Sequence, residues 1–176
     1  MIRGDGMTDR RISDILRGIT VIIDTREHEE GNCSNIKSWF NNNGIKYVRR
    51  CLKFGDYSFE LNGESYENYV VVERKSGLTE LSGNLAQNRE RFENELQRAK
   101  DAGARVILMV EGGGWDNIIE HKYRTDLNER SFLASLFSFQ CRYPLYVQFV
   151  PAKYAGMFIY SQFHYFLREK LKELGI

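Results

Sequence analysis

The stretch "GDYSFELNGESYENYVVVERK", residues 55–75, decides the fold. Two runs rich in aromatic and β-branched residues flank Asn62-Gly63, which is the strongest short hairpin signal in the chain. The second run contains three valines at 70–72 and then changes directly to three charged residues at 73–75. This pattern predicts an antiparallel pair of strands, of which the second is buried and ends in charge.

Outward from this hairpin, segments typical of strands and helices alternate along the chain. Strands are expected at 19–25, 45–52, 56–61, 66–75, 105–112 and 144–150. Helices are expected at 8–17, 32–44, 85–102, 127–143 and 152–174. The order predicts an α/β fold with a mixed central β-sheet and helices on both faces. We expect residues 1–18 to be a short helical extension and 19–176 to be one domain.

Composition limits the classes of protein that fit. The chain has 176 residues, 42% of them hydrophobic, and a net charge of +1, so a nucleic-acid surface would have to be local. One such surface is the basic segment "KYVRRCLK", which contains Arg49 and Arg50. No segment has the apolar length of a membrane span or a signal peptide, so a cytoplasmic protein is expected. The three cysteines are odd in number and far apart, which disfavours zinc and a disulfide framework.

The charged end of the second strand predicts a site for phosphodiester cleavage. Residues i and i+2 of a strand share a side, so Glu73 and Lys75 face together and Arg74 faces away. Since the start of one hairpin strand lies near the end of the other, Asp56 should lie beside Glu73. The carboxylates could bind a hard divalent cation, while the lysine could orient water and offset phosphate charge.

These residues carry a resemblance. "GDY…VVVERKS" resembles the G-D…E-R-K signature of the xeroderma pigmentosum group F nuclease family, a branch of the restriction-endonuclease-like nucleases. "IIDTRE" resembles its opening strand, and "NRERFENELQRAKDAGARVILMVEG" and "FLASLFSFQCRYPLYVQFV" resemble its later helix–strand pairs, so that the similarity covers about residues 19–170.

The resemblance implies a restriction-endonuclease-like fold and a Mg²⁺- or Mn²⁺-dependent endonuclease that acts on branched or single-strand-containing DNA. It implies metal ligation by Asp24, Asp56 and Glu73. The catalytic set it implies is Asp24, Glu27, Asp56, Glu73, Arg74 and Lys75. Within this set Lys75 would position water or phosphate, and Glu27 and Arg74, with Arg26, would orient the site or contact phosphate. The expected DNA-binding residues are Arg26, Arg49, Arg50 and Arg91; the alternative for Arg91 is an i,i+4 pair with Glu95.

The sequence departs from the family pattern E-R-K-x-x-x-D. Thr79 occupies the position of the final aspartate, and Glu80, one residue later, is a candidate replacement carboxylate. Many family members also carry tandem helix-hairpin-helix domains, and residues 19–176 contain none. We therefore expect either a partner that grips DNA, such as a helicase or another repair protein, or a nuclease that acts alone on a simpler substrate. The aromatic-rich helix at 152–174 predicts a homodimer through the C-terminal region.

Two other functions stay open on the sequence. The departure at Thr79 favours a non-catalytic DNA-binding scaffold subunit with a degenerate site, whereas retention of Asp24, Asp56, Glu73 and Lys75 favours the enzyme. The second is a restriction-type duplex nuclease, which has the same acid–acid–x–Lys pattern of catalytic residues.

Overall fold

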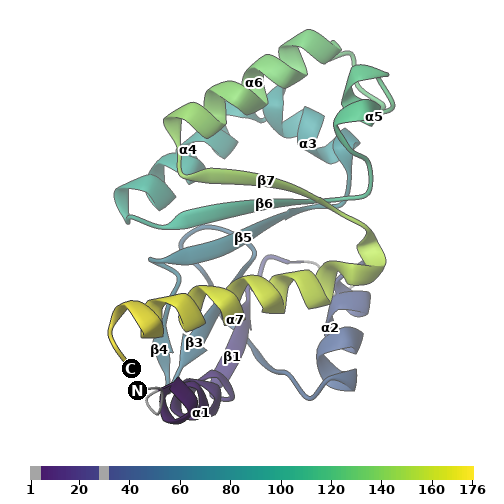
Figure 1. Ribbon diagram of the computed structural model, residues 1–176. Coiled ribbons are helices and arrows are strands. Elements are labelled where there is room, and N and C mark those ends of the chain that lie inside the picture. Colours follow the sequence, from purple (N-terminus) through teal and green to yellow (C-terminus); the bar gives the residue numbers. More distant parts are fainter. Residues whose placement is uncertain (1–4, 28–31) are drawn as a thin grey trace.

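A mixed β-sheet forms the middle of the structure, and helices cover both of its faces (Figure 1). The structure is a computed structural model that describes residues 5–27 and 32–176. Its strands are β1 (Ile19–Ile23), β2 (Lys46–Arg49), β3 (Tyr57–Leu61), β4 (Glu64–Ser65), β5 (Val70–Lys75), β6 (Arg105–Glu111) and β7 (Leu145–Val150). Its helices are α1 (Asp5–Leu16), α2 (Asn32–Asn42), α3 (Leu78–Leu85), α4 (Arg89–Asp101), α5 (Trp115–Ile119), α6 (Glu129–Arg142), the 3₁₀ turn η1 (Ala152–Tyr154) and α7 (Ala155–Glu173). The predicted fold class is confirmed.

The strand order is β2-β1-β3-β5-β6-β7, with β4 paired to β3. β3 runs antiparallel to β1 and β5, whereas β1–β2, β5–β6 and β6–β7 are parallel pairs. Strand β5 therefore lies in the centre of the sheet and pairs on both sides. The carboxyl ends of β5 and β6 meet at one edge, next to the start of β3.

The predicted hairpin turn is present, but the second strand is shorter than expected. Asn62 and Gly63 have φ angles of 53° and 86°, the left-handed conformation that a two-residue hairpin turn requires. They join β3 to the two-residue β4, and the strand expected at 66–75 begins only at Val70. The chain turns between the two strands, where the Tyr69 amide donates to the Tyr66 carbonyl at 2.9 Å.

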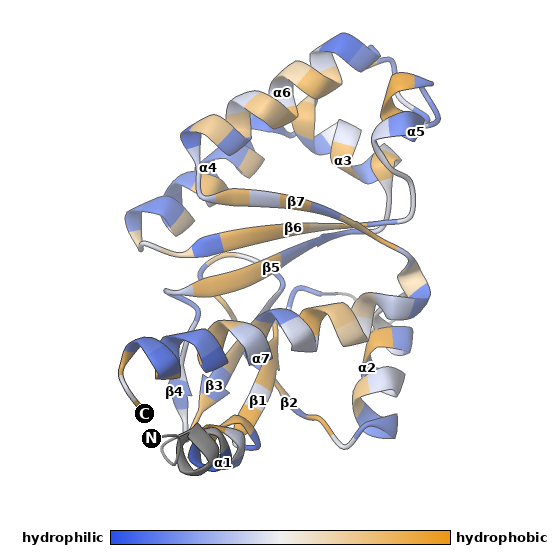
Figure 2. Cartoon of the chain, in the orientation of Figure 1, coloured by the Kyte–Doolittle hydropathy of each residue, from blue (hydrophilic) through white to orange (hydrophobic). Residues whose placement is uncertain are grey.

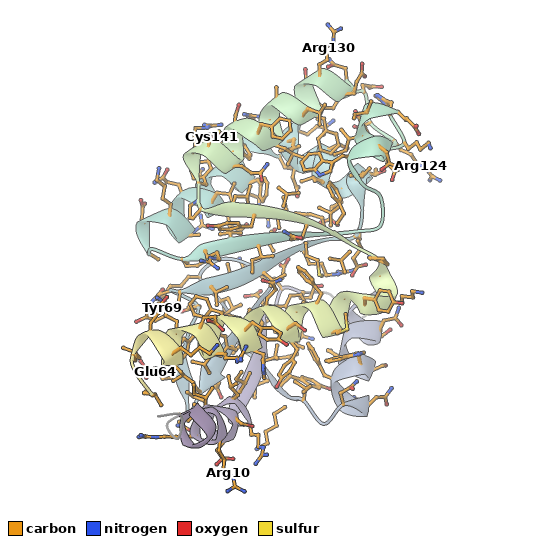
Figure 3. All side chains as sticks on the ribbon, in the orientation of Figure 1. Arg10, Glu64, Tyr69, Arg124, Arg130 and Cys141 are labelled. Atoms are coloured by element: carbon orange, nitrogen blue, oxygen red, sulfur yellow. The ribbon has the colours of Figure 1, made fainter. Side chains whose placement is uncertain are left out.

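The valines of β5 pack into two separate cores. Val70 and Val72 belong to the core beneath α1, α2 and α7, and Val71 belongs to the core beneath α3, α4 and α6. All three are fully buried, because helices cover both faces of this central strand. A strand that is buried on both faces has a continuous apolar run in its sequence. Figure 2 shows the apolar residues concentrated along the strands and on the helix faces toward them, whereas Figure 3 shows Arg10, Arg124 and Arg130 pointing outward.

The helices expected at 85–102 and 127–143 are present, and the structure adds one helix between β5 and the first of them. The helix expected at 85–102 is α4, which begins at residue 89; the added helix is α3, at residues 78–85, and a turn at residues 86–88 separates the two. The buried residues of α3 are Leu78, Leu81, Ser82 and Leu85, which have helical spacing. Because they come directly after the charged end of a strand, the sequence pattern does not predict a helix there. The helix expected at 127–143 is present, and the Asn128 side chain accepts a hydrogen bond from the Ser131 amide at its start.

Helix α7 is largely covered by the domain itself. Ile159, Phe163 and Leu167 are buried against the sheet, in the core that also contains Ile12 and Leu16 of α1. Tyr165 remains 57% exposed, and the homodimer expected from this region stays a prediction. No helix in the described ranges is long and apolar enough to cross a membrane.

Candidate active site

A polar hollow of about 530 Å³ lies at the carboxyl end of β5, between the loop after β1 and the helices α3 and α4. Most of the residues that line it are charged or carry amides. They are Arg26, Glu27, Asp56, Glu73, Arg74, Lys75, Ser76, Glu80, Asn84, Asn88, Arg91, Phe92 and Glu95. The charged end of the buried strand therefore forms the floor of this hollow.

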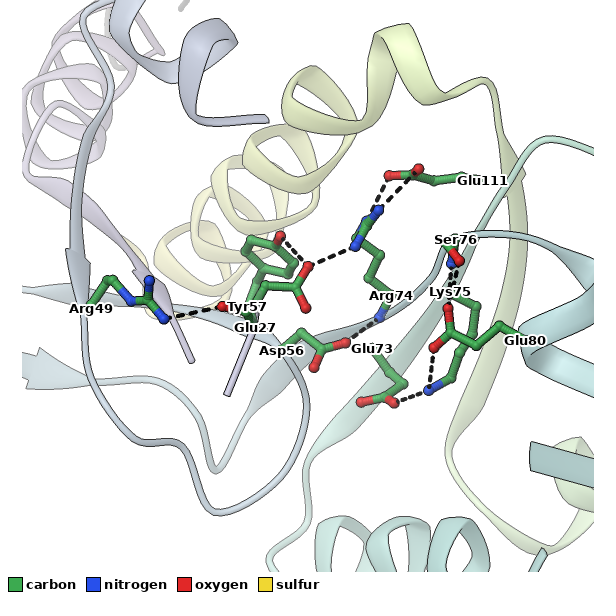
Figure 4. A network of polar contacts seen from close by, with 10 residues as sticks. All are labelled: Glu27, Arg49, Asp56, Tyr57, Glu73, Arg74, Lys75, Ser76, Glu80 and Glu111. Carbon is green, nitrogen blue, oxygen red and sulfur yellow. Dashed lines mark hydrogen bonds and ion pairs between the residues drawn. The ribbon is translucent and has the colours of Figure 1, made fainter. Parts of the chain in front are cut away.

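Asp56 and Glu73 lie side by side, as the hairpin argument predicts. Tyr57 pairs with Val72 in the antiparallel β3–β5 ladder, and the Asp56 amide donates to the Val72 carbonyl at 2.9 Å. Asp56 Oδ2 in turn accepts a hydrogen bond from the Arg74 amide at 2.7 Å. The backbone of β5 thus fixes the Asp56 carboxylate next to Glu73 (Figure 4).

Both carboxylates hold their protons more tightly than free side chains do. Burial, followed by the negative charges of Glu73 and Glu27, raises the pKa of Asp56 well above its usual value. Burial raises the pKa of Glu73 to about 7, and the charge of Glu95 adds to the shift while Lys75 opposes it. Adjacent carboxylates with unbalanced negative charge are typical of a site that receives a cation.

Lys75 faces the same side of the strand as Glu73, in agreement with the strand periodicity. Its Nζ donates to Glu73 Oε1 at 2.6 Å, lies 3.7 Å from Glu80 Oε1, and lies 5.3 Å from the centre of the Phe92 ring. Burial lowers the pKa of Lys75, but the charges of Glu73 and Asp56 and the hydrogen bond to Glu73 outweigh it and raise the pKa above its usual value. The side chain is therefore a fixed positive charge beside the carboxylate pair.

Arg74 points to the other side and links the ends of β5 and β6 to the turn after β1. Its Nε donates to Glu111 Oε1 and its Nη1 to Glu27 Oε1, both at 2.7 Å. Glu27 Oε1 also accepts from the Tyr57 hydroxyl at 3.0 Å (Figure 4). Only 11% of the Arg74 side chain is exposed, and its donors are directed at protein carboxylates. This geometry fits the orienting role expected for Arg74 and Glu27 and does not fit a phosphate contact by Arg74.

Asp24 does not join the carboxylate pair in the hollow. Its Oδ1 accepts from the Arg26 amide and Nε, both at 2.7 Å, and its Oδ2 accepts from the Leu52 amide at 2.6 Å. Burial opposes ionisation, but these hydrogen bonds outweigh it and lower the pKa of Asp24. The geometry thus disfavours the expected metal role, because the carboxylate is fully buried and already accepts hydrogen bonds from Arg26 and from the Leu52 amide.

The four expected DNA-binding arginines divide into two pairs. Arg26 and Arg91 line the hollow, although Arg26 also forms an ion pair with Asp24 at 2.7 Å. The other pair, Arg49 and Arg50, does not line the hollow. Arg49 Nη2 donates to the Thr25 and Glu27 carbonyls.

Arg50 lies outside the hollow, where its Nη2 contacts Glu60 Oε2 at 2.7 Å. The i,i+4 alternative for Arg91 is not among the ion pairs that the described residues form. Of the four arginines, Arg91 is therefore the best placed to meet a substrate at the hollow.

Glu80, the candidate replacement carboxylate, lies at the mouth of the hollow. Its Oε2 accepts from the Ser76 amide at 2.9 Å and from the Ser76 hydroxyl at 2.8 Å. Thr79 does not line the hollow; its hydroxyl accepts from the Arg124 amide at 3.1 Å. Glu80 therefore holds the end of β5 and lies near Lys75, whereas Thr79 faces away.

Sequence reasoning missed three residues that shape this site. Glu111 ends β6, and its position could have been found from the rule that neighbouring parallel strands end at one edge. Glu95 and Asn84 lie on helices, and only the tertiary structure brings them to the hollow. The Asn84 Oδ1 atom is buried and has no hydrogen-bond partner, so it could accept from a bound water or substrate.

The donor set fits a hydrated divalent cation. Within residues 5–27 and 32–176, no group of three or more His, Cys, Asp or Glu side chains is arranged to hold a metal ion. Mg²⁺, however, keeps several waters and is usually bound through one or two carboxylates together with substrate phosphates. Asp56 and Glu73 supply two carboxylates in a polar hollow, which matches that mode of binding.

Comparison with known proteins identifies the relatives of this chain. The model of the ERCC4 domain family matches residues 23–160, which confirms the resemblance predicted from the sequence. The structure of XPF from Aeropyrum pernix is similar with a TM-score of 0.59 and 23% identity, over 81% of this chain and 58% of that one. XPF from Aeropyrum pernix in complex with DNA gives a TM-score of 0.61 and 22% identity, over 85% and 66%. The chain spans less than two thirds of each solved chain. No curated protein matches the chain.

Proposed function

Because the chain belongs to the ERCC4 domain family, we propose that it is a metal-dependent endonuclease that hydrolyses phosphodiester bonds in branched or single-strand-containing DNA. The observation that carries this proposal is the adjacent pair Asp56 and Glu73 with Lys75 in hydrogen-bond contact. This arrangement combines two oxygen ligands with one fixed cation at the floor of an accessible hollow.

Asp56 and Glu73 are the residues that would hold Mg²⁺ or Mn²⁺, and when bound the ion would supply a Lewis acid for the phosphate and lower the pKa of a coordinated water. Lys75 places a positive charge beside Glu73, where it can orient the attacking water and offset charge on the phosphate. Arg74 keeps Glu27 and Glu111 together and so fixes the edge of the sheet that supports these groups.

The DNA would approach from the open side of the hollow, where Arg26 and Arg91 can meet its backbone. A similar solved protein, XPF from Aeropyrum pernix, is described in complex with DNA, and this supports DNA as the substrate. Net charge is only +1, so the contact would depend on these local arginines rather than on a basic surface as a whole.

One observation favours a second function, that of a non-catalytic DNA-binding subunit. Thr79 stands at the position of the family aspartate and faces away from the hollow. The presence of Asp56 beside Glu73, with Lys75 bonded to Glu73, favours the enzyme, because a site without catalytic duty would not need to maintain this costly burial of charge. Binding of branched DNA without cleavage would support the scaffold.

The experiment that tests the proposal is a cleavage assay on a labelled panel: flap, fork, nicked duplex, single strand and linear duplex. We expect cutting of branched substrates in Mg²⁺ or Mn²⁺ and none in EDTA. Cutting only of a defined duplex sequence would favour a restriction-type nuclease. Tight, metal-independent binding without cleavage of any substrate would contradict the nuclease and support the scaffold.

A further inference from the structure

Helix α4 lines the hollow with Arg91, Phe92 and Glu95, and the last two, one turn apart, contact other groups of the site. Phe92 places its ring against the Lys75 ammonium, and Glu95 reaches the loop before β3. There Glu95 Oε1 accepts a hydrogen bond from the Gly55 amide at 2.9 Å, although the two residues are 40 positions apart in the sequence. Gly55 immediately precedes Asp56, so the contact acts directly on the turn that carries one of the two carboxylates.

The Gly55 turn has little freedom to adopt another shape. Gly55 has a φ angle of +73°, and a Cβ atom at this position would lie 2.8 Å from the Val71 Cβ. The backbone therefore passes directly over the buried strand β5. From the following residue, Asp56, the amide donates to Val72 and the carbonyl accepts from the Asp24 amide at 2.8 Å. The Gly55 amide is the point at which a side chain from the helical layer fixes this path.

We propose that Glu95 is a positioning residue, which holds Asp56 in place through the Gly55 amide. The inference rests on the proposed function of Asp56 and Glu73. It assigns to Glu95 a hydrogen-bond acceptor role rather than a role as a third metal ligand, since its Oε1 is directed at a backbone donor. An outer residue that orients a ligand in this way typically changes metal affinity or activity about 10–100-fold when it is removed.

The acceptor role and a ligand role give opposite results for a conservative substitution. Glu95→Gln retains an oxygen that can accept from Gly55 and removes the charge. Glu95→Met has a similar length and helix propensity but no comparable acceptor. If Glu95 acts through the hydrogen bond, Glu95→Gln preserves function and Glu95→Met does not. A metal ligand would lose function in both variants.

The test measures Mn²⁺ binding by calorimetry and flap cleavage at several Mn²⁺ concentrations, for wild type, Glu95→Gln, Glu95→Met and the control Glu90→Met on the exposed face of α4. We expect Mn²⁺ affinity to fall about 10–100-fold in Glu95→Met and to stay within about 3-fold of wild type in Glu95→Gln and Glu90→Met. Thermal unfolding confirms that each protein is folded, and Glu95→Ala replaces Glu95→Met if the latter does not fold.

Three results would overturn the inference. Wild-type affinity in Glu95→Met would show that the Gly55 contact does not position Asp56. Equal losses in Glu95→Gln and Glu95→Met would assign Glu95 to the metal or to a charge effect. A wild-type protein that neither binds Mn²⁺ nor cleaves would overturn the proposed function itself, whereas the first two results would leave that function standing.

Discussion

The close approach of Gly55 to Val71 permits a quantitative prediction for Gly55→Ala. The substitution adds a methyl group in a left-handed conformation, which costs an L-residue about 1–2 kcal/mol. The new Cβ would also lie 2.8 Å from Val71 Cβ and 3.0 Å from its Cγ2. Val71 is fully buried and β-branched, so it cannot rotate away easily, and such overpacking costs about 1–3 kcal/mol. We expect a total loss of about 2–5 kcal/mol in the free energy of unfolding.

Gly44→Ala is the matched control for this prediction. Gly44 has a φ angle of +66°, but no atom lies within 4 Å of its added Cβ, so only the conformational cost remains. In urea denaturation with an m-value of about 2 kcal/mol/M, the extra 1–3 kcal/mol should lower the midpoint of Gly55→Ala by about 0.5–1.5 M relative to Gly44→Ala. Equal midpoints for the two variants would refute the packing of the Gly55 turn against β5.

Three further predictions follow from the site. Because the pKa of Glu73 is raised to about 7 from 4.5, the folded state binds its proton more tightly than the unfolded state does. The contribution of Glu73 to the free energy of unfolding of the metal-free protein, about 3 kcal/mol, should therefore be lost as pH rises from 4.5 through 7. Urea denaturation in EDTA should show a smaller fall over this pH range in Glu73→Gln than in wild type. Arg74→Gln should cost about 3–5 kcal/mol because it removes the positive charge paired with two largely buried carboxylates, Glu27 and Glu111, against about 0–1 kcal/mol for the more exposed pair in Arg50→Gln. Similar urea midpoints for the two variants would contradict this reading. Glu80→Ala should lower the single-turnover cleavage rate about 10-fold or more, whereas Thr79→Ala should leave this rate unchanged. A larger loss of rate in Thr79→Ala than in Glu80→Ala would show that Glu80 does not replace the family aspartate.

The local part of the site could be predicted from the sequence because strand geometry determines it. The period of two separates Arg74 from Glu73 and Lys75, and the antiparallel order of β3 and β5 brings the start of one strand near the end of the other. The exact register could not be predicted, because the Asn62-Gly63 turn pairs β3 with β4 and the turn at residues 66–69 then shifts the pairing of β3 with β5.

The rest depended on contacts that no local pattern encodes. Asp24 matches the family position, but the direction of its carboxylate is decided by the turn to Arg26 and by the Leu52 amide, 28 residues away. Glu95 is one of several charged residues on an amphipathic helix, and only the packing of α4 brings it to Gly55. Helix α3, which was not expected, is likewise stabilised by the packing of Leu81 and Leu85 into the core.

The most direct test of the central claim is single-turnover cleavage of a flap DNA in Mg²⁺ by wild type, Asp56→Asn, Glu73→Gln and Lys75→Ala, with each protein shown to be folded. We predict cleavage by wild type and a loss of at least about 100-fold in rate for each variant, because each change removes a group from the carboxylate pair or its fixed cation. A Glu73→Gln protein that cleaves at the wild-type rate would contradict the assignment of this hollow as the active site.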